Sequence, residues 1–183
     1  MTNNKVVCDT DEPAMSSEFS GRLFQIISRI SDAVNNRLST GDIAELKRLN
    51  PADPCIPAFW KLMVSCVGEE GIHLAGKNNR DEAEQQWAVV LSAIAHMQNQ
   101  HRQGRKLGDA LAEAEYSELR LTKLLRATGD TLRNLIRGMT LFLVSKGEPF
   151  DPLDLARLIF SDGKPWSESF RRQIARSYYA NIM

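Results

Sequence analysis

The stretch SELRLTKLLRATGDTLRNLIRGMTLFLVSKG, residues 117–147, sets the fold class of this chain. Its apolar residues recur every three or four positions, which places them on one side of a helix that turns 100° per residue. Ser117 and Asp130 are residue types that cap helix starts, and Gly147 is the type that favours a helix end. The stretch therefore predicts two consecutive amphipathic helices, the first from 118 and the second from 130 to 147.

The same helical spacing continues on both sides of this stretch. No run of residues alternates apolar and polar side chains with β-branched enrichment, so strands are not expected. We therefore predict an all-α fold of about eight or nine helices in two packed helical bundles. The other helical segments are predicted from Ser16 to near Leu38, around 42–49, from Pro57 to Gly68 or Gly71, from Asn79 to about 96, over 106–114, and after Asp151 and Ser167.

Two polar stretches divide the chain. Residues 1–15 are polar, acidic and aperiodic, which is typical of a flexible tail. The stretch HMQNQHRQGRK at 96–106 interrupts the helical pattern and is the best candidate for a boundary. The predicted organisation is a flexible acidic tail over 1–15, an N-terminal helical bundle over 16–100 and a C-terminal basic helical bundle over 101–183.

Composition excludes several protein classes. Lysine plus arginine total 23 and aspartate plus glutamate total 23, so the net charge is 0, which disfavours a wholly basic, histone-like nucleic-acid binder. Hydrophobic residues make up 43% and charged residues 25%, as in ordinary globular proteins. No apolar run approaches the roughly 20 residues of a membrane span. The first residues do not resemble a secretory signal, so we expect no membrane association and a cytoplasmic location.

Signatures of catalysis and metal binding are missing from the sequence. It contains no GxGxxG, GxxxxGK[ST] or GxSxG pattern, and no histidine lies in an HExxH pattern. Cys8, Cys55 and Cys66 lack CxxC spacing, and we interpret them as reduced thiols. We therefore expect a protein that is not an enzyme, with no catalytic residues, no metal site and no cofactor.

The charges are unevenly distributed although their sum is zero. Residues 1–100 carry 9 basic and 13 acidic side chains, a net charge of −4, whereas residues 101–183 carry 14 and 10, a net charge of +4. Helical rotation places three cations of 118–127 on an arc of about 120°, opposite the leucines. These cations are either a solvated helix face or part of a groove that binds phosphates. The candidate nucleic-acid-binding residues are Lys47, Arg48, Arg105, Lys106, Arg120, Lys123, Arg126, Arg133, Arg137 and Lys164.

Three segments carry a resemblance to a known family. They are IPAFWKLM at 56–63, LGDALAEAEYSELRLTKLLRA at 107–127 and DPLDLARLI at 151–159. Together they resemble the small, CasB-like subunit (Cse family) of the type I-E CRISPR Cascade surveillance complex. The middle segment is the most specific, because it combines LGxALA, a polar gap and an ending in Leu-Leu-Arg-Ala.

The resemblance implies a non-enzymatic, all-α subunit of two helical subdomains that acts in antiviral defence. Members of the family are present as a pair, so the implied protein partners are a second copy of this chain and the backbone and large subunits of Cascade. The implied nucleic-acid partners are the CRISPR RNA, the target DNA and the displaced single-stranded DNA of the R-loop. Base pairing by the guide supplies sequence recognition, so such a subunit needs contacts with the phosphate backbone only.

The resemblance also assigns individual residues. Arg48, Arg120 and Arg126 fall at basic positions of the family pattern. Arg137 and Lys164 match further basic positions if small gaps are allowed, and Lys123 departs from the pattern.

The alternative is a helical adaptor that joins protein subunits and contacts no nucleic acid. Its charges would then be solvated or paired across protein interfaces, and Trp60, Trp87 and Trp166 would be possible anchors. Trp60 and Trp87 lie on apolar stripes, so we expect these two to be buried.

Overall fold

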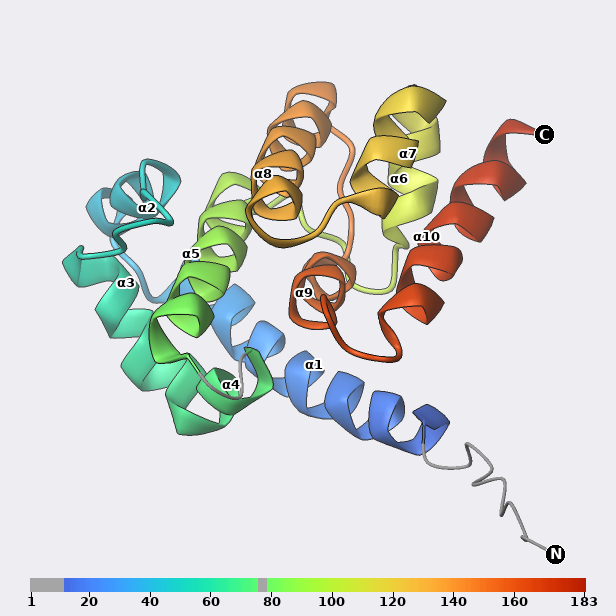
Figure 1. The fold of residues 1–183 in the computed structure, drawn as a ribbon. Coiled ribbons are helices and arrows are strands. Elements are labelled where there is room, and N and C mark those ends of the chain that lie inside the picture. Colours follow the sequence, from blue (N-terminus) through green and yellow to red (C-terminus); the bar gives the residue numbers. More distant parts are fainter. Residues whose placement is uncertain (1–11, 76–78) are drawn as a thin grey trace, which may run out of the picture.

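The computed structural model describes residues 12–75 and 79–183, and these residues confirm the all-α prediction (Figure 1). They form ten α-helices and one π-helical turn, and no strand. Residues 1–11, which make up most of the predicted tail, lie outside the described residues. The elements are α1 (Glu12–Asn36), α2 (Thr40–Lys47), α3 (Pro57–Leu62), η1 (Met63–Val67), α4 (Gly68–Ala75), α5 (Arg80–His96), α6 (Leu107–Glu113), α7 (Glu118–Arg126), α8 (Gly129–Lys146), α9 (Pro152–Phe160) and α10 (Ser167–Ile182).

Among the differences from the predicted helix boundaries, two lie in α1 and at the start of α4. Helix α1 begins at Glu12, so the last residues of the predicted tail, 12–15, are helical. The helix that starts at Pro57 does break at Gly68, whose φ of 61° lies in the left-handed region, but α4 begins at this same residue. Glycine can turn the chain and start a new helix, which explains why the structure has one helix more than the pattern predicted.

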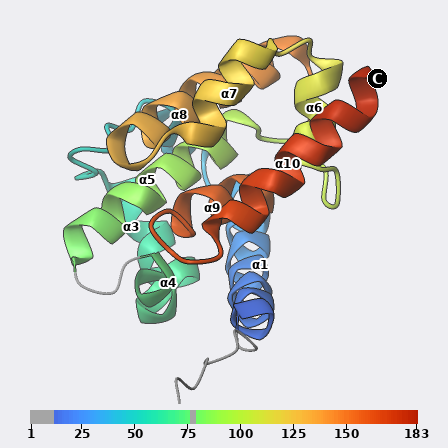
Figure 2. The ribbon, with the colours of Figure 1, turned by 45° about the vertical axis from the view of Figure 1, so that its right-hand side comes forward.

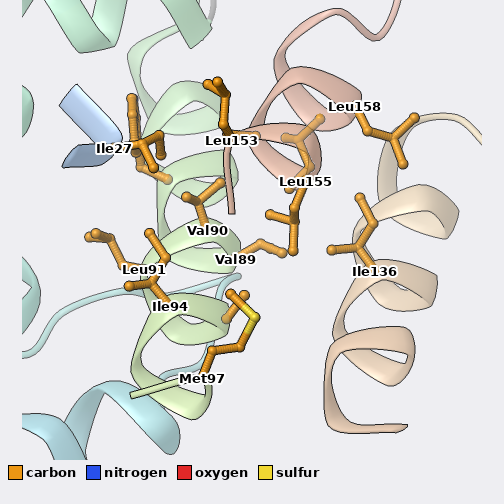
Figure 3. Packing of buried hydrophobic residues seen from close by; sticks show 14 of the residues in the cluster. Ile27, Val89, Val90, Leu91, Ile94, Met97, Ile136, Leu153, Leu155 and Leu158 are labelled. Atoms are coloured by element: carbon orange, nitrogen blue, oxygen red, sulfur yellow. The ribbon is translucent and has the colours of Figure 1, made fainter. Parts of the chain in front are cut away.

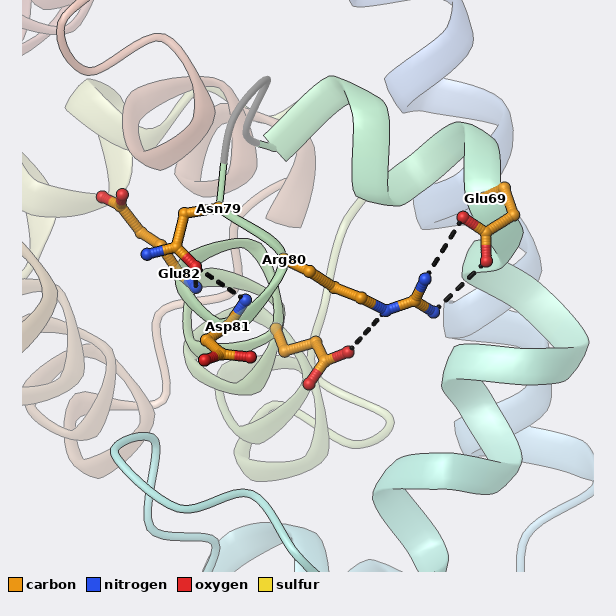
Figure 4. A network of polar contacts seen from close by, with 6 residues as sticks. Glu69, Asn79, Arg80, Asp81 and Glu82 are labelled. Carbon is orange, nitrogen blue, oxygen red and sulfur yellow. Dashed lines mark hydrogen bonds and ion pairs between the residues drawn. The ribbon is translucent and has the colours of Figure 1, made fainter.

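Helix starts are set by local side chains at three places. Ser39 and Asp42 form a reciprocal capping box at α2, because each side chain accepts a hydrogen bond from the other residue's backbone N–H. Asn79 Oδ1 accepts from the backbone N–H of Asp81 at 3.0 Å at the start of α5 (Figure 4). Asp151 caps α9 by accepting from Leu153, as predicted.

Helix α5 lies at the centre of the molecule, where it packs against α2, α4, α8 and α9 (Figures 1 and 3). Residues 86–95 of this helix are all buried. Trp87 is fully buried and its Nε1 donates a hydrogen bond to the Gly71 carbonyl at 2.9 Å. Val89 of α5 faces Leu155 of α9 and Ile136 of α8 in Figure 3. One hydrophobic core therefore includes residues from both sides of the predicted boundary between 100 and 101. The division into two bundles stays a prediction.

Helices α6 and α10 cross in very close contact, and this contact supports α7 (Figure 2). A Cβ built on Gly108 would lie 2.3 Å from the Ile174 carbonyl oxygen and 2.0 Å from Ser177 Oγ. Tyr178 Oη donates a hydrogen bond at 2.5 Å to the carbonyl of Tyr116, just before α7. Only glycine allows the two backbones to approach this closely, so Gly108 fixes the base on which α7 lies.

Candidate nucleic-acid interface

Helix α7 presents its cations to solvent. Leu121 and Leu124 are buried against the protein, whereas Arg120, Lys123 and Arg126 are exposed. The predicted amphipathic arc therefore exists in three dimensions, with leucines inside and cations outside. Ser117 is the N-cap residue of this helix, as predicted, although its side chain makes no capping hydrogen bond.

The next helix, α8, runs back alongside α7 (Figure 2). The two helices are antiparallel, because Arg120 near the start of α7 reaches the ring of Phe142 near the end of α8. The same ring packs edge-on against Tyr116, with centroids 5.4 Å apart. Lys146, on the last turn of α8, also lies over this ring. We call the surface formed by Arg120, Lys123, Arg126, Phe142 and Lys146 the α7–α8 surface.

Lys146 is missing from the candidate residues that the sequence predicted. It is exposed and lies 5.8 Å from the centroid of the Phe142 ring. A sequence signal was present, since residues 142 and 146 are four apart and share one face of a helix. A single lysine beside an aromatic residue is a different signal from an arc of cations, and it is the signal that identifies Lys146.

A buried ion pair holds the junction between α7 and α8. Arg171 is 7% exposed and donates to the carbonyls of Leu125 and Ala127 at the end of α7. It also donates to Asp162 at 3.0 Å, and the other oxygen of that carboxylate accepts from the Gly129 N–H at 2.7 Å.

Asp162 therefore caps α8 from a distant part of the chain. The predicted cap at Asp130 is wrong: α8 begins at Gly129 with Thr128 as N-cap, and no side chain of the N-cap residue bonds to the helix. Sequence reasoning expected a local cap, whereas the hydrogen bond comes from residue 162, 33 positions further on.

A second group of cations surrounds His96 at the end of α5. The His96 Nε2 lies 3.1 Å from the carbonyl oxygen of Lys47, the last residue of α2. Arg137 of α8 lines a small cavity together with His96 and Pro51. Burial, followed by the positive charges of Lys47 and Arg137, lowers the pKa of His96 below its usual value, against a raising contribution from the backbone hydrogen bond.

This second group and the α7–α8 surface lie on opposite flanks of α8. Helical rotation places Arg137 about 140° from Phe142 around the α8 axis. The outer face between them, with Asn134, Gly138 and Leu141, is exposed. Arg48 lies next to Lys47, is exposed, and hydrogen-bonds the Ala44 carbonyl through its Nε at 3.1 Å. The structure thus divides the cations into two groups. One lies between α2 and α8, and the other is the α7–α8 surface.

Three of the predicted binding residues instead contact other parts of this protein. Arg105 donates to the Pro149 carbonyl and forms ion pairs with Glu113 and Glu148. Arg133 pairs with Asp130 and lies 3.8 Å from a carboxylate oxygen of Glu82. Lys164 donates to the Leu74 carbonyl at 2.7 Å and lies over the rings of Phe19 and Trp166. Their placement favours structural roles for all three.

The remaining predicted cations have a different environment. Lys106 is exposed at the N-cap of α6 and faces α9 and α10, away from the α7–α8 surface. Across 12–75 and 79–183, no ion pair involves Lys47, Arg48, Lys106, Arg120, Lys123, Arg126, Arg137 or Lys146.

Other kinds of site find no support in the part of the chain that the structure describes. No group of three or more His, Cys, Asp or Glu side chains there could hold a metal ion. Cys55 is exposed and Cys66 is buried, and both are free thiols, whereas Cys8 lies outside the described residues. None of the described helices is both long and apolar enough to cross a membrane.

Comparisons with known proteins agree with this architecture. The family model for CRISPR-associated protein Cse2 matches residues 42–179. The fold is similar to a chain in the crystal structure of E. coli Cascade bound to a PAM-containing dsDNA target, with 24% identity, a TM-score of 0.60, and coverage of 84% of this chain and 96% of that chain. It is also similar to CasB from Thermobifida fusca, with 17% identity, a TM-score of 0.61, and coverage of 88% and 97%. No curated protein sequence matches.

Proposed function

The chain belongs to the Cse2 family of CRISPR-associated proteins, the small subunits of Cascade, and we propose that it holds nucleic-acid strands of that complex through its unpaired cations. One observation carries this proposal: the exposed cations of α7 and the last turn of α8 form no ion pair with any residue in the described parts of the chain. A solvated helix face usually mixes both charge signs, whereas the arc of Arg120, Lys123 and Arg126 contains cations only.

The chemistry of these side chains suits phosphate oxygens. An arginine guanidinium can donate to two oxygens at once, and each phosphate neutralised by a lysine or arginine releases condensed counterions. Such contacts carry no sequence information. They therefore fit a complex in which base pairing by a guide RNA selects the target.

The proposed ligands are the CRISPR RNA paired with target DNA and the displaced single strand of the R-loop in a type I-E complex. One Cascade structure with a similar fold was solved with a dsDNA target bound, which supports this assignment. The proposed protein partners are the backbone and large subunits and a second copy of the chain. The proposed role is binding without catalysis.

The test uses assembled Cascade with the small subunit changed at Arg120, Arg126 and Arg137 to alanine. Each lost phosphate contact should flatten the slope of log affinity against log salt by about 0.9, so the triple variant should lose roughly 2 to 3 units of slope. The matched control removes three exposed, ion-paired arginines elsewhere, Arg22, Arg37 and Arg172. An unchanged slope in the first variant, or an equal loss in the control, would contradict the proposal.

A protein adaptor remains the second candidate, because Trp60 is exposed where the sequence predicted it to be buried. Trp60 was expected to be buried, yet it is 40% exposed on α3, and Val64 one turn later is 81% exposed. These two apolar side chains lie far from α7 in the chain and favour a protein contact there. A crosslinking map of Cascade separates the roles: contacts of 120–137 to protein only would favour the adaptor, and contacts to RNA or DNA would favour nucleic-acid binding.

A further inference from the structure

The α7–α8 surface contains apolar side chains that phosphate binding does not require. Phe142 is partly buried, and its ring lies between the helices with Arg120 and Lys146 each 5.8 Å from its centroid. Attraction between a cation and an aromatic ring extends to about 6 Å, so both cations lie at the outer limit of this interaction. Either side chain can therefore leave the ring at little cost.

Two exposed leucines lie on the outer sides of the same two helices, α7 and α8. Leu119 is 67% exposed, and helical rotation places it between Lys123 and Arg126 on the outer side of α7. Leu141 is 42% exposed and lies on α8 between the directions of Arg137 and Phe142. Single exposed leucines are common on proteins. Here they project from the same two helices as cations that have no ion pair, so both apolar and basic groups are available to one ligand.

We propose that the α7–α8 surface binds unstacked nucleobases of a single strand, with Phe142, Leu119 and Leu141 contacting base faces while Arg120, Lys123 and Lys146 contact phosphates. This inference rests on the proposed function and names the part of a bound single strand that the apolar side chains contact. In a duplex the base faces are covered by neighbouring base pairs, so exposed apolar groups would gain nothing from it. In a single strand each base has a free face that can stack on an aromatic or apolar side chain.

The experiment measures binding of the full-length chain at low ionic strength by fluorescence anisotropy. Three labelled probes of equal length are used: an oligothymidylate, an abasic oligonucleotide with the same number of phosphates, and a DNA duplex. We expect the oligothymidylate to bind at least about 5-fold more tightly than the abasic strand, since one stacked base contributes at least this factor. Phosphate contacts alone predict equal binding of the two strands.

The variants separate base contacts from phosphate contacts. Phe142→Leu retains an apolar side chain against Tyr116 and should reduce the preference for the base-bearing strand, as should Leu119→Ala combined with Leu141→Ala, which changes only exposed side chains. Lys123→Ala should weaken binding of both strands by the same factor. Val64→Ala, at an exposed apolar site outside this surface, is the matched control and should leave both affinities unchanged.

The outcomes distinguish this inference from the proposed function. Equal affinity for the oligothymidylate and the abasic strand, tighter binding of the duplex, or no binding of any probe overturns the inference. None of these results alters the salt-slope test in assembled Cascade, which tests phosphate contacts by themselves. If that slope test fails and the base preference is also absent, both proposals fall.

Discussion

Two regions of the molecule hold similar cations in opposite environments. At the start of α5, Arg80 lies between Glu69 and Glu84, with guanidinium nitrogens 3.2 Å and 3.0 Å from carboxylate oxygens (Figure 4). On α7, Arg120 and Arg126 are also exposed, and they form no ion pair within the described residues.

This difference explains why the net charge of zero was a weak guide to function. In 1–100 four of the seven described arginines and lysines pair with neighbouring carboxylates, namely Arg22, Arg37, Lys61 and Arg80. In α7 and at the end of α8 they are not. A phosphate responds to the local field, which paired charges cancel and unpaired charges retain. The pairing of each cation is therefore more informative than the sum.

A buried, paired cation should stabilise the fold more than an exposed one. Arg171→Ala should destabilise the protein by about 3 kcal/mol, because it leaves the Asp162 carboxylate without its partner and removes the donor to Leu125 and Ala127. The free energy of unfolding, measured in urea, checks this value.

The neighbouring residue supplies the control for this measurement. Arg172 is exposed and pairs with Glu168 one turn away, so Arg172→Ala should cost less than about 0.5 kcal/mol. Equal losses in the two variants would show that the buried ion pair does not hold the α7–α8 junction.

The close contact between α6 and α10, which supports α7, should also contribute to stability. Gly108→Ala should destabilise the protein by about 1 to 3 kcal/mol, because the added Cβ would meet the backbone of α10 at Ile174 and force the two helices apart. The midpoint of urea or thermal unfolding measures the loss.

Gly138 is the matched glycine, since it lies inside α8 and a Cβ there would meet no atom within 4 Å. Gly138→Ala should therefore leave stability unchanged or raise it by up to about 1 kcal/mol, through the higher helix propensity of alanine. A similar loss in both variants would mean that helix crossing distance does not limit stability at Gly108.

Local patterns in the sequence predicted the helices well, and long-range contacts explain where they failed. The leucines and cations of 118–127 occupy the predicted faces of α7, because helical periodicity is a local property. Asp162 caps α8, and Glu148 is one of the two ion-pair partners of Arg105. Both contacts join distant parts of the chain, so local residue spacing could not predict them. Trp60 was misjudged for a related reason: it lies on an apolar stripe, but the packing of the whole fold leaves it 40% exposed.

The smallest expected effect is on the pH dependence of stability, which should depend on the cations around His96 and not on the α7–α8 surface. His96 has a lowered pKa in the folded protein, so the unfolded chain binds more protons than the folded protein between that lowered value and about 6.5. Stability should therefore be fully present above pH 6.5 and fall as the pH drops through this window, because burial and then the charges of Lys47 and Arg137 disfavour a protonated His96. His96→Gln has no titratable group and should flatten the pH dependence below about 6.5, as measured by urea unfolding. The α7–α8 surface contains no histidine, so removing charge there by Lys123→Ala should leave the slope of stability against pH unchanged. An unaltered pH dependence in His96→Gln would mean that burial and the two cations do not disfavour the charged imidazole. The cations around His96 would then not differ from the α7–α8 surface in their response to pH.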